Sequence, residues 1–221
     1  MRKLTGAAFV SLDGVMQAPG GPTEDPTGDF DQGGWVFGIG DDVIDPVLGE
    51  LFTPPYALLL GRRTYDIFAA YWPFVDGEMA GMGNALTAAD KHVVTRRDRP
   101  LDWANSYRLD GIAAIRALKE SDGPDVLIQG SSTLYPPLLA AGLIDELVLM
   151  TFPVMLGSGK RLFGDGTPPG ALRLLDHRVG AKGVIVTRWV QSGPIPTVGH
   201  PHPSDSAAEA ERQRRMIEGT W

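Results

Sequence analysis

The sequence predicts an α/β protein with a mixed, mostly parallel sheet, flanking helices and an antiparallel hairpin at one edge. Two observations lead to this fold class. Short apolar runs without polar alternation, typical of strands buried on both faces of a sheet, are separated by segments with helical periodicity. After them, two strand-like runs at 171–179 and 183–191 are joined by a glycine-rich turn, a pattern that indicates antiparallel strands.

The N-terminal part predicts one strand, one long loop and one helix. The first strand covers 3–11 and ends at an Asp-Gly turn. The loop over 12–41 is rich in Gly, Pro and Asp, and loops of this length usually belong to active sites or lids. Apolar residues on one face predict a helix over 42–52, and Asp41 and Asp42 are candidates to cap its start.

Strands and helices then alternate, each followed by a stop signal. Glycine, proline or a polar turn ends each periodic segment. In order, the sequence predicts strand 56–60, a helix that ends before Pro73, a mostly irregular segment 74–90, strand 91–95, a weak strand 105–109, a helix that starts after Asp110 and ends at Gly123, strand 125–129, a helix near 132–141 and strand 145–152.

The last part of the chain differs in character. It is rich in proline and then in charged residues, and a helix is expected to begin at Ser206, which has capping-box spacing with Glu209. We therefore expect one domain over 1–192, followed by a linker and helical tail over 193–221. The tail is either a solvated extension or an arm that docks on a second subunit with Trp221 as its anchor.

Composition excludes several classes of function. The chain has 221 residues, a formal net charge of −7 and no extended basic stretch, so a nucleic acid is not expected as a partner. The absence of cysteine excludes disulfides, thiolate nucleophiles and Cys-based zinc sites, and it fits the cytoplasm. No segment approaches the length of a membrane span. The short apolar run at 4–10 resembles a first strand more than a signal peptide. His200 and His202 alone are too few for a metal site, so no metal is expected.

Three predicted strands end in similar chemistry. Each apolar run stops at small, hydroxylated or cationic residues where a helix or loop should begin. In open α/β sheets, ligands bind outside the carboxyl ends of the strands, and helix-initiating N–H groups beside arginines favour anions. We therefore expect a phosphate-bearing cofactor across these strand ends, which are Leu60-Gly61-Arg62-Arg63-Thr64, Val94-Thr95-Arg96 and Gln129-Gly130-Ser131-Ser132.

At these residues the chain resembles the dihydrofolate reductase-like superfamily, and within it the branch that resembles the C-terminal reductase domain of the bifunctional riboflavin-biosynthesis deaminase/reductase. The resemblance covers about residues 1–191 and depends on six segments in the family's order. They are Ser11-Leu12-Asp13-Gly14, Leu60-Gly61-Arg62-Arg63-Thr64-Tyr65, Val94-Thr95-Arg96, Val126-Leu127-Ile128-Gln129-Gly130-Ser131, Gly142-Leu143-Ile144-Asp145-Glu146-Leu147 and Pro153-Val154-Met155-Leu156-Gly157-Ser158-Gly159-Lys160-Arg161-Leu162-Phe163.

The resemblance implies the three-layer dihydrofolate reductase-like fold, the cofactor NADPH and, because related reductases often dimerise, a homodimer. It implies that the helix start after strand 56–60 meets the cofactor's phosphates, that Thr95 and Arg96 hold the adenosine 2′-phosphate, and that the turn at Gly130-Ser131 approaches the pyrophosphate and nicotinamide. The cofactor-binding residues expected in this way are Gly61, Arg62, Arg63, Thr64, Thr95, Arg96, Gly130, Ser131, Ser132 and Leu134.

The resemblance also gives candidates for the substrate side. Asp13 belongs to a Ser-Leu-Asp-Gly sequence shared with the riboflavin-type reductases, although Asp-Gly is also a common turn. Asp45 stands at the family's spacing for a helical carboxylate, or is an exposed helical aspartate. These two are the catalytic candidates. Trp35 could stack on a planar substrate or anchor the loop. With Gly14 and Met150, it completes the expected substrate site.

Two departures leave the substrate open. Met150 stands where folate reductases place a threonine, and the lysine usual soon after the Asp-Gly turn of the riboflavin branch is replaced by Val15-Met16-Gln17. We therefore expect a cytoplasmic NADPH-dependent reductase that transfers a hydride to a small planar heterocycle, pterin- or pyrimidine-like, or to an imine. The alternative is a non-catalytic protein of the same fold that binds NADP(H) or a flavin nucleotide.

Overall fold

The computed structural model describes residues 1–197, 199 and 206–220. One sheet contains eight strands: β1 Leu4–Ser11, β2 Tyr56–Gly61, β3 Asp90–Val94, β4 Ser106–Leu109, β5 Asp125–Gln129, β6 Glu146–Phe152, β7 Leu172–Val179 and β8 Ile185–Gln191. Their order is β4-β3-β2-β5-β1-β6-β8-β7. The pairs from β4 to β6 are parallel, and β8 is antiparallel to both β6 and β7. The predicted fold class is confirmed.

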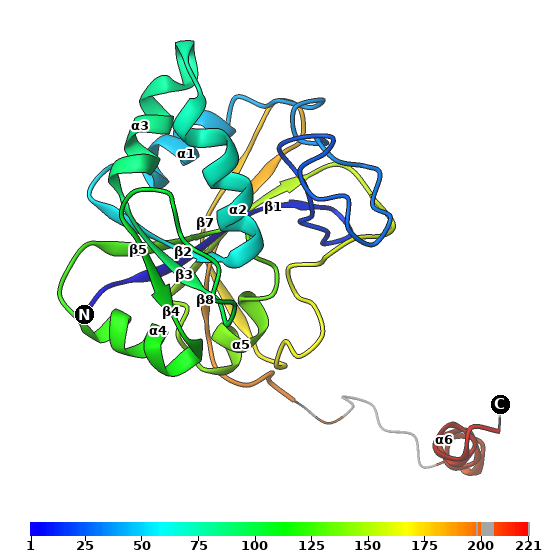
Figure 1. Ribbon diagram of the computed structural model, residues 1–221. Helices are drawn as coiled ribbons and strands as arrows, with labels where there is room; N and C mark the ends of the chain where they lie inside the picture. Colours follow the sequence, from blue (N-terminus) through cyan, green and yellow to red (C-terminus); the bar gives the residue numbers. More distant parts are fainter. Residues whose placement is uncertain (198, 200–205, 221) are drawn as a thin grey trace.

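Helices cover both faces of the sheet (Figure 1). The helices of the domain are α1 Ile44–Leu51, α2 Arg62–Tyr71, α3 Ala80–Ala88, α4 Gly111–Glu120 and α5 Tyr135–Ala140, with two 3-10 turns, η1 Trp72–Phe74 and η2 Gly77–Met79. Val47, Tyr65 and Leu86, from α1, α2 and α3, share one buried cluster with alternate residues of β2. Ile115 of α4 and Leu138 of α5 belong to the cluster on the opposite face. The core is thus two apolar layers separated by the sheet.

The segment predicted as irregular, 74–90, contains a helix. The two glycines of α3 made this helix hard to predict from the sequence, because glycine lowers helix propensity by about 1 kcal/mol. The structure explains why glycine is present. A Cβ on Gly83 would lie 2.6 Å from the carbonyl oxygen of Trp72, so only glycine lets α3 pack this closely on η1. The tertiary contact outweighs the local preference.

Asp41 and Asp42 do not cap α1, whose N-cap residue is Val43 and has no side-chain cap. Their carboxylates instead accept hydrogen bonds from the turn between β7 and β8. Asp41 Oδ2 accepts from the backbone N–H groups of Lys182 (2.8 Å) and Val184 (3.1 Å). Asp42 Oδ1 accepts from the N–H of Ala181 at 3.1 Å. The prediction of a helix cap is therefore wrong. The two aspartates instead connect the end of the loop 12–41 to the β7–β8 hairpin.

The tail contains the expected helix, α6 Ala207–Glu218. Ser206 Oγ accepts a hydrogen bond from the N–H of Glu209 at 3.2 Å, as the capping-box spacing predicts. Trp221, the expected anchor, lies outside the described residues, as do 198 and 200–205. Within the described ranges, every helix is too short or too polar to cross a bilayer.

Candidate cofactor and substrate site

The carboxyl ends of β2, β3 and β5 meet at one edge of the sheet. Gly61, the last residue of β2, is in register with Val94 of β3, and Leu59 is in register with Ile128 of β5. The three segments that follow these strands therefore border one cavity of about 1340 Å³. All ten expected cofactor residues line it, namely Gly61, Arg62, Arg63, Thr64, Thr95, Arg96, Gly130, Ser131, Ser132 and Leu134.

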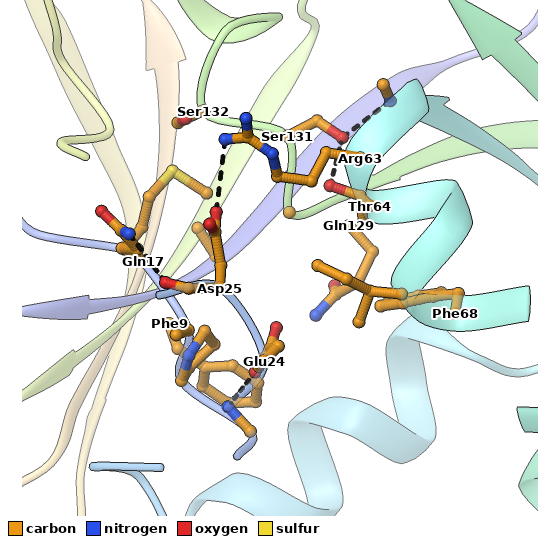
Figure 2. A pocket seen from close by; sticks show the side chains of 18 of the residues that line it. Phe9, Gln17, Glu24, Asp25, Arg63, Thr64, Phe68, Gln129, Ser131 and Ser132 are labelled. Carbon is orange, nitrogen blue, oxygen red and sulfur yellow. Dashed lines mark hydrogen bonds and ion pairs between the residues drawn. The ribbon is translucent and has the colours of Figure 1, made fainter. Parts of the chain in front are cut away.

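Ser131 ties the β5–α5 turn to the start of α2 (Figure 2). Its Oγ accepts a hydrogen bond from the N–H of Gly61 at 2.7 Å and donates one to Thr64 Oγ1 at 2.8 Å. Gly130 and Ser131 both have positive φ, +72° and +65°, and the peptide bond between them is trans. A Cβ on Gly130 would lie 3.1 Å from Thr64 Cγ2. The turn thus presents bare backbone at the cavity wall, where a pyrophosphate could approach.

The start of α2 fits an anionic group. Its N-cap residue is Gly61, which supplies no side-chain cap, so the N–H groups of the first turn are left for water or a ligand. The aligned peptide dipoles of this 10-residue helix place partial positive charge at the same point. This cradle and the cations beside it fit the phosphates of a dinucleotide.

The four arginines that line the cavity differ in their partners. Arg62 turns towards the protein, with Nε 2.9 Å from Asp66 Oδ1 and Nη1 donating to the carbonyl of Arg99 at 2.9 Å. Arg63 Nη1 lies 3.5 Å from Asp25 Oδ2 (Figure 2). Arg96 and Arg97 are both exposed and, in the described part of the chain, neither forms an ion pair. These two arginines, which follow β3, are therefore the ones most open to a ligand.

The loop 12–41 folds against the cavity around two buried residues, Gln17 and Asp25. Gln17 Nε2 donates to the carbonyls of Asp25 and Thr27, both at 2.8 Å, and its Oε1 accepts from the N–H of Lys160 at 2.9 Å. The Asp25 carboxylate pairs with the Lys160 ammonium and with Arg63. Burial alone would raise the pKa of Asp25, but the hydrogen bonds from Lys160 and Thr27 outweigh it and lower the pKa. These contacts hold the loop over the site.

The other end of the cavity is mostly apolar. Phe9, Phe52, Phe68 and Phe152 contribute to its lining. Asp45, the candidate carboxylate of α1, also lines it and is exposed. Aromatic walls of this kind suit a planar, uncharged ring system.

Asp13 and Gly14 do not line the cavity. The Asp13 carboxylate accepts hydrogen bonds from Ser11 Oγ at 2.6 Å and from the N–H groups of Leu156 (3.1 Å) and Gly157 (2.9 Å). These bonds, that from Ser11 first, lower the pKa of Asp13 to about 2. Gly14 has φ +85°, as its turn requires. Both residues join the end of β1 to the segment after β6, so we do not propose them for catalysis or substrate binding.

Trp35 and Met150 also lie outside the cavity lining. The Trp35 indole N–H donates to the carbonyl of Gln17 at 2.9 Å, and its ring packs edge-on against Phe152 at 5.4 Å. This geometry is that of a loop anchor. Met150 is fully buried in the core, because it stands in the central strand β6. The substrate contacts expected of these two side chains therefore have no support in the structure.

Sequence reasoning missed several polar residues of the cavity, and Glu24 and Gln129 are two of them. Glu24 lies in an irregular loop without a motif. Gln129 precedes Gly130 in a segment used only for its glycine-turn chemistry. Strand alternation could have found Gln129, because it is two residues after Leu127, which packs under α1, α2 and α3.

The comparison with protein families decides the chain's relationship. The family model of the RibD C-terminal domain matches residues 2–186. The chain belongs to this family. Family and fold are those of reductases. Met150 and the Val15-Met16-Gln17 segment, where the sequence departs from the expected residues, both lie inside the matched range.

The chain is also similar to individual proteins. The chain is 27% identical over 188 residues to the uncharacterised protein YyaP of Bacillus subtilis strain 168, an alignment that covers 81% of this chain and 91% of the relative. Three solved structures share the fold, each over 86% of this chain. A proposed riboflavin biosynthesis protein from Shewanella sp. PV-4 has TM-score 0.65, 20% identity and 99% coverage. A pyrimidine reductase-like protein from Corynebacterium diphtheriae has TM-score 0.58 and 15% identity, and 92% of its chain is covered. Dihydrofolate reductase from Enterococcus faecalis, solved with NADP(H) and RAB-propyl, has TM-score 0.53 and 14% identity, and 96% of its chain is covered.

Proposed function

We propose that the chain is a cytoplasmic NADPH-dependent reductase that acts on a small planar heterocycle, pterin- or pyrimidine-like, or on an imine. The observation that carries the proposal is the convergence of three strand ends on one cavity, with α2 and Arg96 at its phosphate-like end and aromatic residues at the other. One end suits a dinucleotide phosphate and the other a flat ring. The Enterococcus faecalis enzyme of the same fold was solved with NADP(H), which adds support.

Each part of the cavity has a task in this proposal. The first turn of α2 and the Gly130–Ser131 turn hold the pyrophosphate, while Thr95 and Arg96 bind the 2′-phosphate that distinguishes NADPH from NADH. When bound, NADPH supplies a hydride from C4 of its nicotinamide. The aromatic walls orient the acceptor and exclude water, which is most of what hydride transfer requires of a protein.

The proposal is tested in two steps. Calorimetric titration should show saturable NADPH binding that is tighter than NADH binding. NADPH oxidation, followed by absorbance, should then be stimulated by at least one acceptor from a panel of pterins, ribosylaminopyrimidines and quinones. Binding without oxidation across the panel would favour a non-catalytic nucleotide-binding protein, and a yellow purified sample would favour a flavin protein.

We also propose a homodimer that uses β7. This strand is at the edge of the sheet, and Leu172, Leu174, Leu175 and Val179 on it are 37–65% exposed. An edge strand with apolar side chains is prone to pair with another copy. Sedimentation should give a dimer, which Leu174→Asp weakens and Leu12→Asp, at an exposed leucine outside β7, does not. A monomeric wild type at micromolar concentration would contradict the proposal.

A further inference from the structure

Reduction of a C=N or C=O bond needs a proton as well as a hydride. If the chain is the reductase proposed above, some group at the apolar end of the cavity must deliver that proton or admit a water molecule that does. The acidic side chains of the lining are Glu24, Asp25, Asp41, Asp42, Asp45 and Asp66. Their partners show which of them can carry a proton.

Four of these carboxylates are already bound by other groups of the protein. Asp25 pairs with Lys160 and Arg63, and Asp66 with Arg62. Asp41 and Asp42 accept backbone hydrogen bonds from the β7–β8 turn. Although burial opposes it, the hydrogen bonds to Asp41 lower its pKa to about 2. Asp45 is exposed on α1, where water competes for its carboxylate.

Glu24 differs from all of these. It is partly buried, and among the described residues no cation forms an ion pair with it. One carboxylate oxygen, Oε2, accepts a hydrogen bond from the N–H of Gly20 at 2.6 Å, which helps to fix the side chain. Burial, assisted by the negative charge of Asp25, raises the pKa of Glu24 although the N–H groups of Gly20 and Gly21 oppose the rise.

Gln129 complements Glu24. It ends β5 on the sheet face that carries α1, α2 and α3. Figure 2 shows its amide and the Glu24 carboxyl both directed into the pocket, whose lining also includes Phe9 and Phe68. The buried Oε1 of Gln129 has no hydrogen-bond partner in the described structure. Because no such bond fixes the orientation of the amide, rotation about χ3 can turn either its oxygen or its nitrogen to a ligand.

We propose that Glu24 is the acid that protonates the substrate, and that Gln129 orients the substrate by hydrogen bonds to its polar edge. The substrate class is then a neutral planar ring in which the reducible C=N or C=O group lies near an amide-like N–H and C=O edge. The hydride adds to the carbon, the π electrons move to the nitrogen or oxygen, and that atom takes the proton of the Glu24 carboxyl. NADPH becomes NADP⁺, and water reprotonates the Glu24 carboxylate.

The first test needs neither substrate nor activity. NMR titration of the Glu24 carboxyl carbon in the folded protein should give a pKa above the ordinary glutamate value of about 4.3. The groups that could influence the result are the charged residues of the same cavity, namely Asp25, Asp41, Asp42, Asp45, Arg62, Arg63, Asp66, Arg96, Arg97 and Lys160. A pKa at or below the ordinary value overturns the proposal.

The second test uses the panel acceptor that is reduced fastest, starting with 7,8-dihydropterin, which carries a ring C=N bond. Glu24→Gln should lower kcat at least about a hundredfold, the usual contribution of a general acid. It should also abolish the fall of kcat/KM at high pH, while the NADPH dissociation constant stays within about twofold. Glu24→Asp should restore part of the activity. Glu120→Gln, at an exposed glutamate of α4, is the matched control and should behave as wild type.

The outcomes separate this inference from the proposed function. A wild type that binds no NADPH, or reduces no acceptor, overturns the reductase proposal and this inference with it. An active wild type accompanied by a Glu24→Gln variant of similar kcat and the same pH profile overturns the inference alone. If Glu24→Gln does not fold, the Glu24→Asp variant carries the test through its shifted pH profile. Gln129→Met should raise KM about tenfold and leave NADPH binding unchanged, and an unchanged KM removes Gln129 from the proposal.

Discussion

Ser131 is the residue through which the turn after β5 supports the start of α2, and replacing it by alanine tests that support. Its hydroxyl makes two hydrogen bonds, 2.7 Å to the Gly61 N–H and 2.8 Å to Thr64 Oγ1. Each contributes about 0.5–1.5 kcal/mol net, so Ser131→Ala should lower the free energy of unfolding by about 1–3 kcal/mol. Because Ser131 is only partly buried, we expect the lower half of that range. Urea denaturation measures the change.

Two further variants separate the hydrogen bonds from backbone strain. Ser131→Gly also loses the bonds but relieves the cost of φ +65° at a non-glycine residue, so it should be more stable than Ser131→Ala. Ser132→Ala, one residue further along and without a side-chain hydrogen bond in the described structure, should be close to wild type. If Ser131→Ala unfolds at the same urea concentration as wild type, the turn does not depend on this tie. In that case the serine at this position has no structural explanation.

Three other changes test separate parts of the account. Arg96→Ala should raise the NADPH dissociation constant about 10- to 150-fold, because a charge-assisted pair contributes about 1.5–3 kcal/mol. The NADH dissociation constant, measured by the same calorimetry, should stay almost unchanged. Equal losses of affinity for both cofactors would contradict the 2′-phosphate role. Lys91→Met should lower the free energy of unfolding, measured by urea denaturation, by about 2–4 kcal/mol. The fully buried Lys91 ammonium donates to three carbonyls at 2.7–2.9 Å, and these carbonyls would lose their partner. The control Lys182→Met, at an exposed lysine, should have no effect. The lowered pKa of Asp25 contributes stability above the unfolded-state value of about 3.9, and this contribution is lost as pH falls through the folded-state pKa. Asp25→Asn should therefore show a flatter dependence of the urea midpoint on pH below about 4, and an unchanged acid limb would rule this ion pair out as a source of acid sensitivity.

The parallel part of the sheet could be predicted because its signal is local. The central residues of β2 and β5 are buried, and in the sequence they form unbroken apolar runs. The polar residues that follow both strands line the cavity. Gly61 to Thr64 and Gly130 to Ser132 needed only this pattern and the general position of ligands in α/β sheets.

What the sequence could not supply depends on distant partners. Asp41 is a good helix cap by type and position, yet its carboxylate binds a hairpin 141 residues further along the chain. Asp13 is expected at a catalytic position by its motif, but its carboxylate is used by Ser11 and the segment after β6. Gly83 made α3 hard to predict, because glycine is unfavourable in a helix. It is needed there because a side chain would clash with the carbonyl of Trp72. Glu24 lies in a loop whose path is set by Gln17 and Asp25, which no periodicity reveals.

A crystal structure of the protein grown with NADPH tests the central claim most directly. We expect the 2′-phosphate within hydrogen-bond distance of Thr95 and Arg96. The pyrophosphate should lie against the first turn of α2 and the Gly130–Ser131 turn, and the nicotinamide should face the aromatic end of the cavity. A cofactor bound elsewhere on the molecule, or crystals that remain free of it at millimolar NADPH, would contradict the account.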